Sequence, residues 1–206
     1  VEEIDAIIDS HGQMLSCEVN GTINGHSRLS GVPDLTMVFV DPSVIDDCSF
    51  HPCVRYARYE RERVISFVPP DGHFEVGGFF RDFFAIFLHN SEDITVQITF
   101  PKSVRTVDAN TETGSCLFDD ATKTLKWTVG KFNPKKAASP SLKAAIVLQQ
   151  GAAVPDEKPM VLLGFKVPFT TVSGLAVETL VLTNENYKPY KGVRTLTQAG
   201  RFQIRT

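Results

Sequence analysis

The chain has 206 residues, of which 42% are hydrophobic and 22% are charged, and its formal net charge is -3 at pH 7. This length can bury a substantial core, and it fits one large all-β domain or two small β-sandwiches. The net negative charge argues against a nucleic-acid binder. The sequence contains no run of 18 or more apolar residues, so we expect no membrane-spanning helix.

Most segments with a clear pattern are strand-like, and turn-forming residues such as Asn20-Gly21 and those of 69–72 separate them. In chain order the expected strands are 2–8, 13–20, 22–29, 35–40, 54–59, 63–68, 73–76, 77–88, 94–100, 115–118, 125–129, 142–149, 161–168 and 175–182. The segment 77–88 has phenylalanines at helical spacing, but it is short and lies between β patterns, so we expect a strand there. Strands at this spacing, without a long helix, predict antiparallel sandwiches.

The last twenty residues, 187–206, contain five Lys or Arg and no acid. From Gly192 to Thr206 the β-branched and aromatic residues, interrupted only by Ala199-Gly200, predict a strand, a tight turn and a terminal strand. Pro189 and the bare backbone at Gly192 favour an exposed edge to which an extended peptide could add. A terminal hairpin with a solvated basic face is the alternative interpretation.

The four cysteines are too few for a disulfide scaffold, and the first residues do not resemble a signal peptide, so we expect a soluble, cytosolic, reduced protein. Cys48, His51 and Cys53 have the spacing Cys-x2-His-x-Cys, but a zinc site needs a fourth ligand, which the sequence does not supply. The neighbouring acids Asp46 and Asp47 would point to opposite faces of a strand. With no nucleophile elbow and no phosphate loop, we expect no catalytic residue, no metal and no cofactor.

Three stretches together resemble the medium (mu) chains of the clathrin-adaptor complexes: 30–35; 46–72, with Phe-His-Pro-Cys-Val-Arg and Ser-Phe-Val-Pro-Pro-Asp-Gly; and 191–194 with 200–206. The Tyr-Lys-Pro-Tyr-Lys-Gly-Val run and the Phe-Gln-Ile-Arg-Thr ending look most like the mu chains of adaptor protein complex 3. The resemblance implies an elongated all-β mu homology domain of two antiparallel β-sandwich subdomains, the second inserted into the first. The first would comprise 1–76 and 158–206, and the second 77–157.

The family captures Tyr-x-x-Φ sorting signals, where Φ is a bulky apolar residue, in the cytosolic tails of membrane cargo. The resemblance implies that such a signal binds along the strand carrying Lys191, Gly192, Val193 and Arg194. By motif position Arg194 matches the base packed against the signal tyrosine. His26 falls where some relatives use a lysine beside that tyrosine. The residues that match the lining of the Φ pocket are Leu175, Val177, Leu180 and Val193.

The resemblance also implies partners and a location. The partners are the other subunits of a heterotetrameric adaptor and, through the lysine-rich stretch 121–155, anionic lipid headgroups. The location is the cytosolic face of Golgi, endosomal and vesicle membranes, in transport toward lysosomes and related organelles.

Two departures from the family pattern bear on the site. The family's aromatic-x-Asp contribution to the tyrosine pocket would fall before Val1, and relatives carry roughly thirty more residues of β structure around 76–79. The first departure favours an alternative in which the domain is a structural part of the adaptor without a working pocket.

Overall fold

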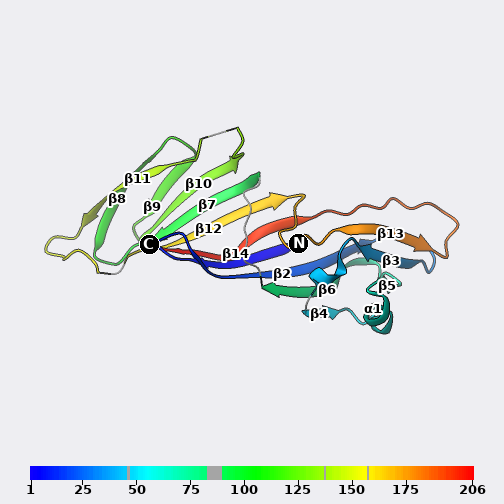
Figure 1. Cartoon of the computed structure of the whole chain (residues 1–206). Helices are drawn as coiled ribbons and strands as arrows, with labels where there is room; N and C mark the ends of the chain where they lie inside the picture. The colour runs from blue at the N-terminus through cyan, green and yellow to red at the C-terminus, as the bar shows by residue number, and fades with distance from the viewer. Residues whose placement is uncertain (46, 83–89, 137, 157) are drawn as a thin grey trace. The chain divides into compact units, whose positions relative to one another are not determined.

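The computed structural model describes residues 1–45, 47–82, 90–136, 138–156 and 158–206. Across these ranges the chain forms fourteen strands, one short α-helix (α1, Tyr56–Glu62) and one 3-10 turn (Pro42–Val44), which confirms the expected all-β class (Figure 1). The strands are β1 Glu2–Ile8, β2 Met14–Ser27, β3 Asp34–Phe39, β4 Asp47–Phe50, β5 Ile65–Phe67, β6 Gly72–Asp82, β7 Ser91–Thr99, β8 Val104–Thr111, β9 Ser115–Asp119, β10 Thr124–Phe132, β11 Leu142–Leu148, β12 Met160–Pro168, β13 Val177–Thr183 and β14 Leu196–Arg205. No helix in the described part of the chain is long and apolar enough to cross a membrane.

The backbone divides into two compact units. The first comprises Val1–Glu3, Glu18–Phe83 and Phe169–Thr197, and the second comprises Ile4–Cys17, Phe84–Pro168 and Gln198–Thr206. Strands β1, β2 and β14 contribute residues to both units. The boundaries expected from the sequence, 1–76 with 158–206 and 77–157, therefore stay a prediction.

The first unit has a three-stranded sheet in the order β13-β3-β5 and a second sheet in which β6 pairs with β2 and β4. Both sheets contribute to one apolar core, with Phe39 and Phe67 from the first sheet and Val76 and Phe79 from the second. Among the described strands β13 pairs only with β3, so it is the edge of its sheet. This edge position matters for the site described below.

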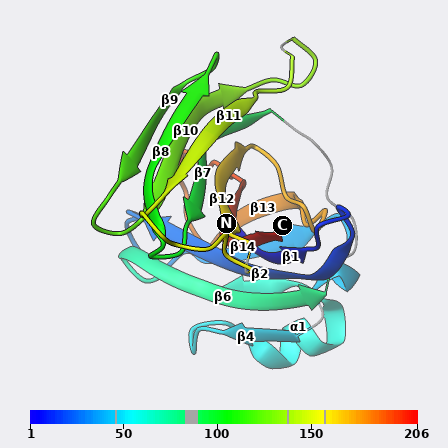
Figure 2. The same cartoon turned by 90° about the vertical axis from the view of Figure 1, so that its left-hand side faces the viewer.

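The second unit has strands in the order β12-β7-β10-β9 and a two-stranded sheet of β11 and β8 (Figure 2). The buried residues between these sheets are Phe100, Val104, Val107 and Leu125. Trp127 on β10 is also buried, and its indole Nε1 donates a hydrogen bond of 2.8 Å to the Thr113 carbonyl.

The strand expected at 54–59 is wrong, because the chain forms helix α1 from Tyr56 onward. The helix is a little under two turns long and is held by Tyr59, whose side chain is only 1% exposed and belongs to the core of the first unit. It ends at Arg63, a left-handed residue with φ 55° whose N–H donates to the Tyr59 carbonyl. The charged residues 60–62, which lie between the strands expected at 54–59 and 63–68, are exposed on the solvent side of the helix.

Two expected turns are also wrong, because Asn20-Gly21 lies inside β2 and Ala199-Gly200 lies inside β14. At both glycines a neighbouring side chain fills the space of a Cβ. A Cβ at Gly21 would lie 2.0 Å from the Phe79 ring, and one at Gly200 would lie 2.3 Å from Asp5 Oδ1. These glycines therefore allow close approach across a continuous sheet, and neither reverses the chain.

The strand expected at 77–88 is present as far as Asp82, within β6, and its remainder lies outside the described residues. The strand expected from Gly192 begins only at Leu196. Residues 192–195, which the sequence placed in that strand, belong to no strand.

Candidate functional site

A cavity of about 640 Å³ opens in the first unit. All eight residues that the sequence placed in a binding site line it: His26, Leu175, Val177, Leu180, Lys191, Gly192, Val193 and Arg194. Its volume lies within the range of pockets that bury a small ligand or a few side chains. The chain thus brings together segments that are more than 140 residues apart in sequence.

The apolar wall of the cavity is formed by strands β3 and β13. Val177 pairs with Phe39 and Leu180 pairs with Met37, and directly paired residues in neighbouring strands share a face of the sheet. Phe39 and Met37 are buried, whereas Val177 and Leu180 are only partly covered. Leu175, 7% exposed, completes this wall just before β13. The wall can therefore accept an apolar side chain against groups already packed into the core.

The rim of the cavity is a segment, 187–195, that is fastened at its two ends. The Tyr187 hydroxyl donates to the Ser30 carbonyl at 2.8 Å and accepts from the Ser30 N–H at 3.1 Å. At the other end, the Phe169 N–H donates to the Thr195 carbonyl at 2.8 Å. Between them, Lys191 Nζ donates to a carbonyl of β13.

Residues 192–194 make no backbone hydrogen bond to another backbone group within the described ranges. Val193 is half exposed, and a Cβ at Gly192 would make only ordinary contact, at 3.5 Å, with the Tyr190 hydroxyl. The rim therefore presents free N–H and C=O groups alongside an apolar cavity, which is what strand addition of a peptide requires.

Two side chains that line the cavity, Arg194 of the rim and His26 of β2, differ in their surroundings. Arg194 makes no ion pair with any residue that the structure describes, so its guanidinium is available to stack on an aromatic ring. His26 on β2 pairs with His73 on β6, and the two rings stack with centroids 3.8 Å apart. This stacking fixes the plane of the His26 ring at the edge of the cavity.

A residue of the site that the sequence analysis missed is Glu2, whose buried carboxylate lies in the cavity lining. Its Oε2 accepts hydrogen bonds from the N–H groups of Val172 (2.7 Å) and Ser173 (3.2 Å) and from the Thr197 hydroxyl (3.4 Å). Its Oε1 accepts from the Ser173 hydroxyl. These bonds hold the loop that leads into Leu175. The alternation of Glu2 with buried Ile4 and Ala6 was the signal that could have revealed it.

The Cys-x2-His-x-Cys spacing does not assemble a metal site. His51 Nδ1 accepts a hydrogen bond from the Cys53 N–H at 3.2 Å, and burial raises the pKa of the Cys53 thiol, which disfavours the thiolate that a metal would need. No group of three or more possible ligands gathers anywhere in the described residues. All four cysteines are free thiols.

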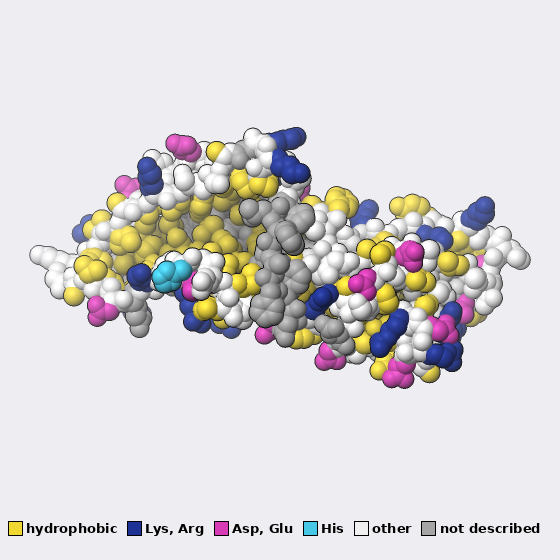
Figure 3. Space-filling view, viewed as in Figure 1, with side chains coloured by type: hydrophobic (Ala, Val, Ile, Leu, Met, Phe, Trp, Pro, Cys, Tyr) yellow, Lys and Arg dark blue, Asp and Glu magenta, His cyan; other side chains and the backbone are white. Residues whose placement is uncertain are grey.

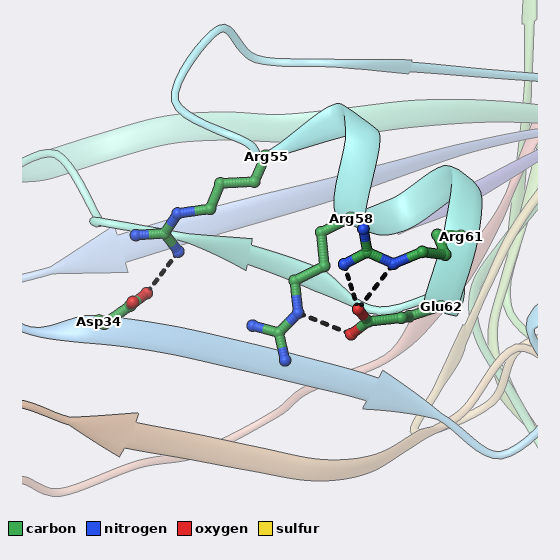
Figure 4. Close-up of polar contacts among 5 residues, drawn as sticks. All are labelled: Asp34, Arg55, Arg58, Arg61 and Glu62. Carbon is green, nitrogen blue, oxygen red and sulfur yellow. Dashed lines mark hydrogen bonds and ion pairs between the residues drawn. The ribbon is translucent and has the colours of Figure 1, made fainter.

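Much of the positive charge near helix α1 is paired within the chain (Figure 4). Arg58 and Arg61 both contact Glu62, at 2.9 and 2.6 Å, and Arg55 contacts Asp34 at 2.6 Å. Hydrogen bonds from Arg58 and then Arg61 hold the pKa of Glu62 below its usual range. Each of these three arginines therefore has a carboxylate partner, so the surface at the helix is not purely cationic.

Comparison with known proteins gives consistent results. The sequence model of the adaptor complexes medium subunit family matches residues 1–79 and 86–206. AP-3 complex subunit mu-2 of Homo sapiens is 41% identical over 237 aligned positions, which take in 100% of this chain and 56% of that protein. The chain thus spans little more than half the length of this relative.

Structures with a similar fold include a homology model of the full-length AP-3 complex in an intermediate open conformation, with a TM-score of 0.68 and 18% identity over 100% of this chain and 66% of that one. Another is the yeast delta-COP-I mu-homology domain complexed with a Dsl1 WxWxV peptide, with a TM-score of 0.63 and 15% identity over 99% of this chain and 95% of that one. At such identities the likeness establishes the fold alone, and the expected fold of the mu homology class is confirmed.

Proposed function

Because the chain belongs to the adaptor complexes medium subunit family, we propose that its first unit is a cargo-recognition site that binds Tyr-x-x-Φ signals in the cytosolic tails of membrane proteins. The family comprises adaptor subunits, so the chain is not an enzyme. The observation that carries the proposal is the free backbone at 192–194 beside a cavity lined by all eight expected residues.

In the proposed complex the signal is extended and pairs its backbone with residues 192–194. The Φ side chain enters the apolar wall formed by Leu175, Val177 and Leu180, and the signal tyrosine packs against the guanidinium of Arg194. Tyr and Φ are separated by two residues, so they lie three positions apart, about 10 Å along an extended chain. A cavity with an apolar end and a cationic rim suits this spacing.

The affinity expected from these contacts is low. Burying the tyrosine and the Φ residue contributes about 1.5 to 3 kcal/mol each, and each backbone hydrogen bond adds about 1 kcal/mol. Association costs at least about 4 kcal/mol, so the dissociation constant should be roughly micromolar or weaker. Useful capture at a membrane would then rely on several contacts acting together.

Other subunits of a heterotetrameric adaptor and anionic lipid headgroups are the proposed sources of these further contacts, at Golgi, endosomal and vesicle membranes. The stretch 121–155 holds six lysines and no acid, although Lys123 is paired with Asp120 and Lys131 with Glu92. Lys126, Lys135, Lys136 and Lys143 are the exposed lysines of this stretch with no ion pair among the described residues. Unchanged binding to anionic liposomes after their replacement by glutamine would exclude the lipid contact.

The direct experiment is calorimetric titration of the full chain with a peptide containing Tyr-x-x-Leu and with its Tyr→Ala version. Binding of the first peptide, weakened at least about tenfold in the second, supports the proposal because the tyrosine contact accounts for more than about 1.4 kcal/mol. Equal binding of the two peptides, or binding of neither, favours the alternative of a structural adaptor part without a working pocket.

A further inference from the structure

The rim of the cavity itself carries the pattern of the signal that we propose to bind there. Of the four tyrosines in the chain, only Tyr190 has an aliphatic residue three positions later, which is Val193. Tyr190 is 96% exposed, more than any other large hydrophobic side chain among the described residues, and Val193 is half exposed. Both ends of this Tyr-x-x-Φ pattern are therefore accessible to a second molecule.

The backbone around Tyr190 is extended and unpaired. Residues 188–195 run without a turn or a bend, and residues 190–194 make no backbone hydrogen bond to another backbone group in the described ranges. Figure 1 shows the segment that joins β13 to β14 as bare chain at the border of the first unit. In the same view, Figure 3 shows hydrophobic side chains and Lys or Arg side chains along that border. The segment therefore offers a free edge for pairing.

Gly192 lies in the middle of this free edge, and its own surroundings do not require a glycine. Its backbone is outside the left-handed region, and an added Cβ would make only ordinary contact, 3.5 Å from the Tyr190 hydroxyl. A glycine in an extended segment costs conformational entropy, and it often marks a close approach by another backbone. No backbone in the described ranges pairs with Gly192, so the glycine suits an approach from outside the chain.

Two copies of this segment can pair antiparallel in a symmetric register centred on Gly192. A twofold axis relates the two copies, so residues at equal distances before and after Gly192 lie directly opposite each other. Tyr190 and Arg194 are two positions before and two positions after it. Tyr190 of each copy is then opposite Arg194 of the other, on the same face and with Cβ atoms about 4.5 to 5.5 Å apart.

Arg194 is suited to this contact because it makes no ion pair with any residue that the structure describes. Its guanidinium can therefore stack on the ring of the opposite tyrosine. The same register places Val193 of one copy opposite Lys191 of the other, and Lys191 Nζ donates to the Leu180 carbonyl at 2.7 Å. The valine thus lies next to the apolar wall, so each rim supplies the two contacts proposed for a signal.

We infer that residues 190–194 of two copies pair antiparallel around Gly192, with Tyr190 of each copy on Arg194 of the other, and that this pairing closes the peptide site. The regulatory role rests on the proposed function, because a signal and a second copy would use the same backbone at 192–194. The pairing itself does not depend on that function.

The dimer is expected to be transient. Pro189 has no N–H group and ends the pairing, so each copy contributes only about five residues. Such a contact buries far less than the roughly 1,200 Å² of a stable complex, and the two basic rims also repel each other. The dimer therefore forms where many copies are concentrated, and a bound signal excludes it.

The test measures self-association of the full chain by fluorescence-detected sedimentation up to about 1 mM, at about 300 mM salt to screen the repulsion. Tyr190→Ala and Arg194→Ala each remove both cross-copy contacts and should weaken the dimer by about tenfold. A mixture of the two variants forms a heterodimer that keeps one contact. It should associate about twofold to fivefold more tightly than either variant does alone.

Two further variants are the controls. Tyr190→Phe keeps the aromatic ring and should leave the dissociation constant within about twofold. Lys188→Ala changes an exposed residue that precedes Pro189 and lies outside the paired stretch, so it should also have an effect of less than about twofold. Circular dichroism establishes that all four variants fold.

The pairing is overturned if the chain stays monomeric up to about 1 mM, or if the mixture associates no more tightly than the separate variants. A fluorescent Tyr-x-x-Leu peptide is titrated separately into the dilute, monomeric chain and into the dimer. Peptide that binds the monomer and dissociates the dimer supports the regulatory role, whereas a dimer that persists at saturating peptide overturns it. No binding to the dilute monomer contradicts the proposed function and the regulatory role together, while the mixture still decides whether the copies pair.

Discussion

The side-chain ammonium of Lys191 donates a hydrogen bond of 2.7 Å to the main-chain carbonyl of Leu180. This contact joins the rim of the cavity to the edge strand β13, which also supplies part of the apolar wall. The width of the cavity between rim and wall therefore depends on one exposed cation.

Lys191→Met should weaken binding of a Tyr-x-x-Leu peptide by about threefold to tenfold, because one hydrogen bond that positions the rim is lost at a solvated site. Lys188→Met is the control, since Lys188 is exposed and does not line the cavity. Calorimetry at two salt concentrations checks the result. An equal effect of both variants would mean that only the overall positive charge of the segment matters.

Leu180→Ser should abolish measurable peptide binding, because it places a hydroxyl where the Φ side chain would pack and removes most of an apolar wall residue. Val181→Ser is the matched control, because Val181 follows Leu180 on β13, is 43% exposed and does not line the cavity. Calorimetric titration of both variants distinguishes the two faces of the strand. Full binding by the Leu180 variant would contradict the proposed location of the Φ pocket.

Glu2→Ala should lower the free energy of unfolding by about 3 kcal/mol, because it leaves buried donors of Ser173 and Val172 without an acceptor. Urea titration measures the change. Glu3→Ala, which alters the exposed acid next in sequence, should cost less than about 1 kcal/mol. If the two variants are equally stable, the bonds of Glu2 contribute no more than ordinary surface contacts.

The stability of helix α1 should depend on pH through Glu62. Its pKa in the folded chain lies below its usual value because Arg58, and then Arg61, donate hydrogen bonds to the carboxylate. A carboxyl with a lowered folded-state pKa stabilises the fold at pH values above its unfolded pKa of about 4.3, and this contribution disappears as the pH falls through the lower folded value.

Glu62→Gln should therefore flatten the acid limb of a plot of urea midpoint against pH, and it should leave the slope near pH 7 unchanged. Glu60→Gln serves as the control, because Glu60 is exposed and makes no ion pair with the described residues. A parallel shift of the whole curve in the Glu62 variant would indicate a general loss of helix stability that does not depend on protonation.

The sequence predicted the β class, and the eight residues that it placed in a binding site all line one cavity, because alternation and the family motifs are local properties of the chain. That these residues bind a peptide stays a prediction. It mispredicted Asn20-Gly21 and Ala199-Gly200 as turns, because the reason for each glycine is a side chain far away in sequence, Phe79 in one case and Asp5 in the other. Strand β8 was not expected, since its charged and polar residues obscure the alternation around Val107.

The site itself was predictable only in part. The motif around Val193 and Arg194 identified the rim, but its attachment through Tyr187 and Ser30 joins residues 157 positions apart. No pattern within a sequence window can indicate such a contact. The same applies to Glu2, whose partners in the loop before Leu175 are about 170 positions away.

The hydrogen bond between Thr197 and Glu2 closes a span of 195 positions. A ribosome adds about 5 to 20 residues per second, so Thr197 is synthesised on the order of 10 to 40 s after Glu2. During this interval strand β1 can pair with β2 on one side, whereas its other edge lacks its neighbour β14. Chaperone occupancy of the nascent chain should accordingly persist until strand β14 has left the exit tunnel.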